Sequence, residues 1–228
     1  MHSTANLPDF ELQNQFVLTA DGRISGTCSQ EPWLGPLFRL VRGKESCAWA
    51  VRVDVPQNIV DELDGLAREE PPVSDFREAP VHAERYVSLL RGEVDSGPAF
   101  TFPDEIVQPD GTVFIEDIES LDYHFTGWTA SEIPSRTPIV AVVEGGYAVS
   151  VCFSAWCSDA AAEAGLETAE AFRGRGLGPR VASGWALAIR ASGRVPLYST
   201  SWSNDASLAV ARKLGLVTYA SKWSIHEG

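Results

Sequence analysis

Residues 173–178 read Arg173-Gly174-Arg175-Gly176-Leu177-Gly178, a glycine-rich turn that follows a short apolar stretch and precedes a helical pattern. Glycine in such a turn lets the backbone approach a ligand closely. The unpaired N–H groups of the helix's first turn and the positive end of its dipole favour an anion, above all a pyrophosphate. The turn lacks the lysine of a P-loop, and Pro179 stands where a dinucleotide-binding fingerprint needs its last glycine. The sequence therefore predicts a phosphate-binding turn of another kind.

The segments around this turn alternate between strand and helix patterns. Two apolar runs meet at Gly145-Gly146 and predict a hairpin, and helices are expected from about Pro179 and Asn204. The expected strands are residues 139–143, 147–153, 164–168, 195–200 and 216–225. The expected apolar stripes are Val181, Trp185 and Ile189 in the first helix, and Ala206, Val210 and Leu214 in the second. This order predicts an α/β domain with a mixed sheet.

The first half of the chain reads as mixed α and β structure. Residues 37–41 and 47–53 predict a hairpin, and helices are expected after Pro56 and across residues 81–90. Residues 69–80 are rich in proline and charge and predict an exposed connection. No motif in this half carries a chemical signature. We expect residues 1–112 to form an N-terminal α+β region that packs on a second domain, residues 113–228.

Composition and charge exclude several classes of function. The 228 residues contain 18 Lys and Arg against 31 Asp and Glu, a formal net charge of −13 at pH 7. A chain this acidic repels phosphate backbones, so no nucleic-acid partner is expected, whereas a cationic or amine-bearing partner suits it. Purely apolar runs such as residues 139–143 are too short to cross a bilayer, and the first residues lack a signal-peptide pattern. We expect a cytoplasmic protein with no membrane partner.

The cysteines and histidines do not form a recognisable metal or disulfide pattern. Cys28, Cys47, Cys152 and Cys157 are too few and too irregularly spaced for a disulfide framework. A four-thiolate zinc site would need two close pairs, and Cys28 and Cys47 are not close. The four histidines show no ligand spacing either. We therefore expect buried, reduced thiols and no bound metal.

A second pattern follows the glycine turn. Asn204-Asp205-Ala206-Ser207 begins the last helix and leads to Lys213-Leu214-Gly215-Leu216. Together with Arg-x-x-Gly-x-Gly at residues 173–178, it resembles the GNAT superfamily of acyl-CoA-dependent N-acetyltransferases over residues 139–225. The resemblance implies a GNAT-like central mixed sheet flanked by helices, with acetyl-CoA as cosubstrate. The alternative is an α/β domain with an incidental glycine turn.

The resemblance also implies where the coenzyme binds. The strand before the turn separates from its neighbour, and its backbone pairs with the pantetheine arm. The pyrophosphate lies on the N–H groups of the turn, although Pro179 has none to offer. Asn204 meets the pantetheine arm, with Ser207 one turn on, and Asn204 also suits a plain N-cap. The implied coenzyme-binding residues are Leu166, Glu167, Thr168, Arg173, Gly174, Arg175, Gly176, Leu177, Gly178, Asn204 and Ser207.

Two acid–base positions of the family have other occupants in this chain. Many relatives have a tyrosine seven residues after the asparagine, which protonates the leaving thiolate, and here that position is Ala211. Some relatives have a catalytic glutamate on the preceding strand, where this chain has Ser199. Tyr198 and Ser199 could protonate the thiolate in this chain, but they are weaker candidates for this role than the tyrosine of the relatives.

The nearest candidates for a base are two glutamates on the third strand. Glu163 and Glu167 have an even spacing, so they share one face of that strand. One of two neighbouring carboxylates can have a raised pKa and accept the proton of the amine, directly or through water. The alternative is structural, with these carboxylates paired to Arg173 or Arg175.

Three functions are compatible with these residues. The first is an N-acetyltransferase in which a primary amine attacks acetyl-CoA directly in a ternary complex. The second is a non-catalytic acyl-CoA-binding or regulatory module, favoured by the missing tyrosine and glutamate. The third is a transferase for longer acyl chains. Peptide N-termini, polyamines, aminoglycoside-like antibiotics and amino acids are the acceptors left open, and residues 1–112 are expected to form a wall of the acceptor site. The protein is expected to be a monomer or a homodimer.

Overall fold

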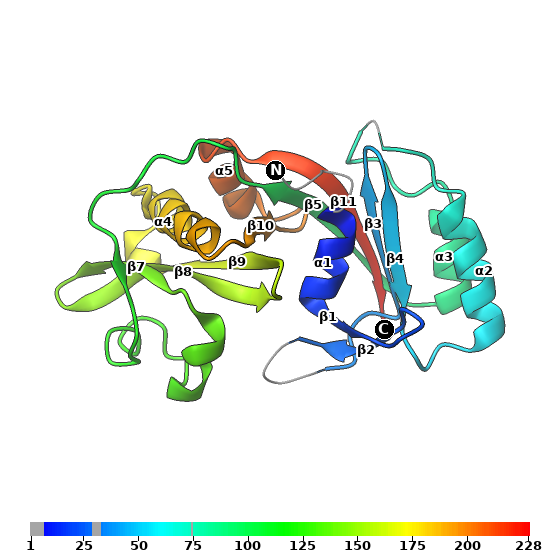
Figure 1. Ribbon diagram of the computed structural model, residues 1–228, viewed down its shortest axis with the longest axis horizontal. Helices are drawn as coiled ribbons and strands as arrows, with labels where there is room; N and C mark the ends of the chain where they lie inside the picture. The colour runs from blue at the N-terminus through cyan, green and yellow to red at the C-terminus, as the bar shows by residue number, and fades with distance from the viewer. Residues whose placement is uncertain (1–6, 29–32, 74) are drawn as a thin grey trace. The chain divides into compact units, whose positions relative to one another are not determined.

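The computed structural model describes residues 7–28, 33–73 and 75–228, and these form two compact units (Figure 1). The first unit contains Met1–Phe100, Ser199–Asp205 and Thr218–Gly228, and the second contains Thr101–Tyr198 and Ala206–Val217. The end of the chain therefore belongs with the first hundred residues. The domain boundary after residue 112 expected from the sequence stays a prediction.

The first unit is built on a sheet with the strand order β4-β3-β11-β5. Strands β3 and β4 form the predicted hairpin, and β11 pairs antiparallel with the other edge of β3. The elements of this unit are α1 (Leu7–Gln15), β1 (Phe16–Leu18), β2 (Ile24–Thr27), β3 (Phe38–Gly43), β4 (Cys47–Val51), α2 (Gln57–Arg68), α3 (Ala83–Leu90), β5 (Glu93–Thr101) and β11 (Val217–His226). The hairpin and helices α2 and α3 confirm the sequence predictions, whereas α1 and β5 were not predicted.

The two faces of this sheet differ in chemistry. Helices α2 and α3 cover one face and α1 lies on the other (Figure 1). The core under α2 and α3 is apolar and includes Phe38, Leu40, Leu63, Tyr86 and Trp223. The residues that α1 buries include Glu11, Asn14 and Gln15, so this helix has no apolar stripe for periodicity to detect.

Most described residues between 69 and 80 are exposed, as their composition predicts, but Glu70 is an exception. The Glu70 side chain is buried, and its carboxylate accepts hydrogen bonds from the backbone N–H groups of Val81 (3.0 Å) and His82 (3.1 Å) and from Tyr86 Oη (3.1 Å). Arg42 lies 3.7 Å from the same carboxylate. Burial, followed by the neighbouring Glu70 charge, raises the pKa of the Tyr86 phenol well above its ordinary value. Glu70 therefore attaches the start of α3 to the sheet.

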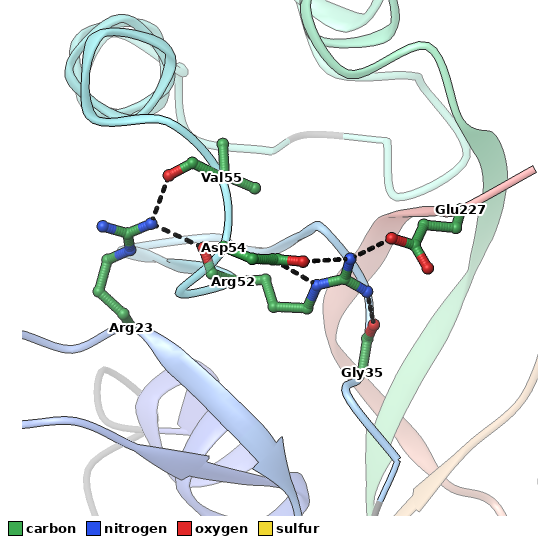
Figure 2. Close-up of polar contacts among 6 residues, drawn as sticks. All are labelled: Arg23, Gly35, Arg52, Asp54, Val55 and Glu227. Atoms are coloured by element: carbon green, nitrogen blue, oxygen red, sulfur yellow. Dashed lines mark hydrogen bonds and ion pairs between the residues drawn. The ribbon is translucent and has the colours of Figure 1, made fainter.

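Arg52 joins three other segments of the first unit (Figure 2). Its buried guanidinium donates to both carboxylate oxygens of Asp54 (2.7 and 2.9 Å), to the carbonyl of Gly35 (3.0 Å) and to Glu227. These hydrogen bonds lower the pKa of Asp54 below its usual range. Arg23 donates to the carbonyls of Arg52 (2.7 Å) and Val55 (2.8 Å), which holds β2 beside the end of the β3–β4 hairpin.

The second unit contains a mixed sheet with the strand order β10-β9-β8-β7-β6. Strands β9 and β10 are parallel, and the other neighbouring pairs are antiparallel. The elements are β6 (Val113–Phe114), β7 (Val140–Glu144), β8 (Tyr147–Cys157), β9 (Ala161–Thr168), α4 (Leu177–Ala191), β10 (Val195–Ser199) and α5 (Asp205–Lys213), with short 3-10 turns at Ala130–Glu132, Pro134–Arg136 and Glu170–Phe172. Every strand and helix predicted around the glycine turn is present, and the mixed α/β fold class is confirmed.

Two layers cover the strands of the second unit. Helix α4 packs on β7, β8 and β9, and its predicted stripe of Val181, Trp185 and Ile189 is fully buried. The irregular segment of residues 115–137 covers the opposite face through Leu121, Phe125 and Ile133 (Figure 1). Within the described parts of both units, no helix is long and apolar enough to span a membrane.

The role of Glu70 gives a stability prediction. Glu70→Ala leaves two backbone donors, a phenol and the buried guanidinium of Arg42 without this acceptor, so we expect the free energy of unfolding to fall by about 3–5 kcal/mol. Urea denaturation of the variant and the wild type measures this difference in the free energy of unfolding. The matched control is Glu69→Ala, because the neighbouring side chain is 74% exposed and its removal should change stability by no more than about 0.5 kcal/mol. Equal losses in the two variants would show that the buried carboxylate has no special role.

Candidate functional site

Strands β9 and β10 pair over a short distance and then stop. The pairs are Val195 with Ala161, Pro196 with Ala162, and Leu197 with Glu163. From Ala164 to Thr168, β9 continues to pair with β8 but has no partner on its other edge among the described strands. This edge presents backbone N–H and C=O groups to which an extended ligand can add like a further strand.

The glycine turn connects the end of β9 to helix α4. A 3-10 turn at Glu170–Phe172 follows β9, and α4 begins at Leu177 with Gly176 as its N-cap. No side chain caps this helix end, and Pro179 contributes no N–H group to it. The remaining N–H groups of the first turn are therefore available to an anion.

The glycines of the turn are needed for different reasons. Gly174 (φ 76°) and Gly176 (φ 74°) have left-handed backbones, which other residues adopt only with strain. A Cβ at either position would meet nothing within 4 Å, so the space beside this backbone is open. A Cβ on Gly178 would lie 3.4 Å from Leu166 Cδ2, so this glycine lets α4 approach β9 closely.

The two arginines of the turn contact their own surroundings. Arg175 pairs with Glu144 through contacts of 2.6 and 3.3 Å and lies over the ring of Phe172. Arg173 Nε donates to the carbonyl oxygen of Thr168 at 3.2 Å. The partner of Arg175 is thus Glu144 on the β7–β8 hairpin, and a structural role of Glu163 and Glu167 paired to Arg173 or Arg175 stays a prediction.

Glu163 and Glu167 differ in exposure although they come from one strand. Glu163 is buried, at 5% exposure, beside the last β9–β10 pair. Glu167 is exposed, and its carboxylate accepts a hydrogen bond from Trp128 Nε1 at 3.4 Å. Of the two carboxylates, only that of Glu167 is readily reached by a substrate.

The environment of Glu167 includes aromatic residues that the sequence did not single out. Trp128 packs edge-on against Phe153, and Arg136 lies over both rings at 4.6 and 5.0 Å. Arg136 also pairs with Glu132. Trp128 lies in a segment without regular periodicity, so periodicity could not mark it as a site residue. The one sign of its importance in the sequence was a large indole side chain in a polar stretch.

Tyr198 and Ser207 are brought together. Tyr198 Oη and Ser207 Oγ lie 2.5 Å apart, and the Tyr198 ring is buried. Burial raises the pKa of the Tyr198 phenol, which makes it a weaker acid. Both observations count against Tyr198 as a direct proton donor to a ligand.

Helix α5 differs in one respect from its predicted pattern. Its buried residues are Leu208 and Ala211, whereas Ala206 of the predicted stripe is exposed. The helix is short and rich in small apolar residues, so more than one stripe fitted its sequence. Asn204 precedes the helix and is exposed, and its own N–H donates to the carbonyl of Ser201 at 3.2 Å.

The thiols are not uniformly buried. Cys152 is buried, and this burial raises the pKa of its thiol well above the usual value. Cys28 and Cys157 are exposed, so the expectation of buried thiols is wrong for both. Each lies at or just beyond the end of a strand, where the alternation of side chains between the two faces of the sheet no longer determines which of them are buried. Within the described ranges, no three His, Cys, Asp or Glu side chains are grouped to hold a metal ion.

Comparison with known proteins finds a family model that is similar to this segment. Residues 139–225 match the model of the family described as GNAT acetyltransferase. An uncharacterised N-acetyltransferase of Bacillus subtilis, YdfB, is 33% identical over 97 residues, which cover 42% of this chain and 37% of the relative. The chain thus matches less than half of the length of this curated relative.

The chain also matches solved structures at low sequence identity. A GCN5-related N-acetyltransferase-like protein from Streptococcus suis is 16% identical, with a TM-score of 0.49 over 84% of this chain and 85% of its own. A GNAT-family acetyltransferase from Colwellia psychrerythraea is 11% identical, with a TM-score of 0.49 over 99% and 98%. The similarity to the GNAT acetyltransferase family thus lies in residues 139–225, which contain β7 to β10, the glycine turn and α5.

Proposed function

We propose that this protein is an N-acetyltransferase that moves an acetyl group from acetyl-CoA to a primary amine by direct attack in a ternary complex. The observation that carries this proposal is the unpaired edge of β9 beside an uncapped helix N-terminus, in a segment that matches the GNAT family model. The edge suits the amide groups of a pantetheine arm, and the helix end suits a pyrophosphate.

In the proposed complex, pantetheine lies along Leu166, Glu167 and Thr168 and pairs with their backbone. The pyrophosphate lies on the N–H groups of the turn formed by Arg173, Gly174, Arg175, Gly176, Leu177 and Gly178. The left-handed glycines and the open space beside them favour this placement. Asn204 and Ser207 are assigned to the pantetheine arm by the family resemblance.

The amine must lose a proton to attack the thioester, and we assign this step to Glu167. Its carboxylate is exposed, and Trp128 Nε1 holds one of its oxygens. The buried Glu163 is the second candidate. When the amine nitrogen bonds to the acetyl carbon and the carbon–sulfur bond breaks, the thiolate leaves. Backbone N–H groups beside the thioester oxygen would stabilise the negative charge on that oxygen.

The substrate amine is left open by these residues. The net charge of −13 favours a cationic acceptor such as a polyamine or an aminoglycoside-like antibiotic. The second candidate function is an acyl-CoA-binding module without catalysis, which the apolar, buried Ala211 at the usual tyrosine position favours. Release of free thiol from acetyl-CoA in the presence of an amine panel separates the two. A cytoplasmic location and a monomeric or homodimeric state stay predictions.

The placement of the glycine turn can be tested by binding. Gly176→Val puts a branched side chain over the helix N–H groups. The Kd of acetyl-CoA, measured by calorimetry, should therefore rise at least about tenfold, which corresponds to the loss of one charge-assisted hydrogen bond. The matched control is Gly193→Val. Gly193 has a similar left-handed backbone (φ 81°) with open space beside it, but follows the opposite end of α4. Equal affinity in both variants would place the coenzyme elsewhere.

The role of Glu167 can be tested by kinetics. Glu167→Gln should lower kcat by about two orders of magnitude, as removal of a general base does, and leave the Kd of acetyl-CoA unchanged because pantetheine pairs with the backbone. Glu170→Gln, an exposed carboxylate three residues on, is the control and should retain full activity. If Glu163→Gln carries the loss instead, the buried carboxylate is the base. If neither substitution lowers kcat, both carboxylates are structural.

A further inference from the structure

A chain of side-chain contacts within the second unit ends at the carboxylate of Glu167. Trp128 Nε1 donates to Glu167 Oε1 at 3.4 Å. The Trp128 ring is nearly perpendicular to that of Phe153, with ring centroids 4.7 Å apart, and the guanidinium of Arg136 lies 4.6 Å from its centroid. All four residues belong to the second unit. One indole therefore contacts a carboxylate, a second aromatic ring and a cation.

The guanidinium over this indole is itself held in place. Arg136 pairs with one oxygen of the Glu132 carboxylate. The other oxygen accepts hydrogen bonds from the N–H (2.8 Å) and the hydroxyl (2.9 Å) of Thr129, in the capping box of a 3-10 turn. A long side chain loses rotamer freedom when it is fixed in this way, which costs free energy. Several side chains of an irregular segment thus cooperate to fix the indole of Trp128.

The backbone of Glu167 is held separately from its side chain. Glu167 pairs with Val151 in the β8–β9 ladder, and Ser150 Oγ donates to the Glu167 carbonyl at 3.2 Å. The residue lies in the part of β9 whose outer edge is unpaired, so its carboxylate is close to that edge. Glu167 Oε2 has no hydrogen-bond partner among residues 7–28, 33–73 and 75–228. One oxygen of this carboxylate is therefore fixed, and the other is available.

We propose that Trp128 is a positioning residue that holds Glu167 Oε1 and so presents Oε2 to the acceptor amine, a role that rests on the acetyltransferase function and on the assignment of Glu167 as base. As the nitrogen of the neutral amine bonds to the acetyl carbon, Oε2 accepts a proton from that nitrogen, and the carbon–sulfur bond breaks. Glu167 then gives this proton to water, and the thiolate takes one from water, so the protons balance.

The chemistry of an indole suits this role. Its nitrogen is a hydrogen-bond donor only, so Trp128 orients the carboxylate without competing for the proton of the amine. A hydrogen bond to the charged form of an acid favours that form, which is the form a base needs. A general base must come within hydrogen-bond distance of the proton that it accepts, and a misplacement of about 1 Å can lower a rate about 100-fold. Trp128 should therefore affect the rate and its pH dependence.

The test measures kcat against pH in the full-length protein, with the amine that gives the fastest turnover. Trp128→Phe keeps an aromatic ring beside Phe153 and Arg136 but removes the N–H group. It should lower kcat about tenfold and leave the Kd of acetyl-CoA unchanged. The acidic limb of the profile should move up by about 0.5–1 pH unit, because the ionised carboxylate loses a donor. In a Glu167→Gln background, Trp128→Phe should cause no further loss of kcat.

The first unit offers a matched control in Trp49. Its Nε1 donates to the Asp64 carboxylate at 2.8 Å, and the guanidinium of Arg68 lies 5.9 Å from the centroid of its ring. Trp49→Phe removes the same kind of hydrogen bond from the same kind of cluster. It should leave both kcat and the acidic limb as in the wild type. The comparison separates an effect on Glu167 from the general cost of losing an indole donor.

Each other outcome has a defined meaning. An unmoved acidic limb, losses that multiply in the Trp128→Phe/Glu167→Gln double variant, or an equal change in Trp49→Phe overturns the positioning role and leaves the acetyltransferase function standing. Should Trp128→Phe fail to fold, Arg136→Gln decides, because it frees the indole; a wild-type profile overturns the role. Full kcat in Glu167→Gln overturns the base and its positioning together. A wild-type protein that releases no thiol with any amine overturns the acetyltransferase function as well.

Discussion

The parallel pairing of β9 with β10 ends after three residue pairs, and the rest of the candidate site depends on this early end. Longer pairing would occupy the backbone groups of Ala164 to Thr168 and leave no edge for a ligand. Strand β9 nevertheless stays ordered, because β8 pairs with it as far as Thr168. Gly165 contributes to this support. A Cβ there would lie 2.4 Å from the ring of Phe153, so only glycine leaves room for that ring against the strand.

The first unit contains two buried carboxylates, those of Glu70 and Glu11, which have different hydrogen-bond partners. Glu70 accepts from two backbone N–H groups and a phenol, and this set of donors fixes the start of a helix. Glu11 faces the ammonium of Lys222 and the phenol of Tyr219, and the network continues to a half-buried hydroxyl. The donors to Glu70 are themselves buried or part-buried groups near the start of α3, whereas the network of Glu11 ends at a hydroxyl group that is only half-buried.

Sequence patterns predicted the second unit well because its elements have strong periodicity and clear glycine boundaries. Val181, Trp185 and Ile189 recur every four residues, and all three are fully buried. The first unit was harder. Helix α1 buries Glu11 and Gln15, so hydrophobic periodicity has nothing to detect. The burial of Glu70 depends on Arg42 and Tyr86, which are distant in sequence, and Trp128 meets Glu167 only through tertiary packing. Motif matching located the glycine turn but had no access to such long-range contacts.

The position of β11 has a consequence for synthesis on the ribosome. This strand lies inside the first unit's sheet, between β3 and β5, although it follows both by more than a hundred residues. The Tyr219–Glu11 hydrogen bond joins residues 208 positions apart. Until β11 emerges, the facing edges of β3 and β5 expose unpaired backbone groups, which are prone to associate with other chains. A nascent chain of this protein therefore carries an incomplete sheet during most of its translation, and chaperones that shield such edges matter most during that period.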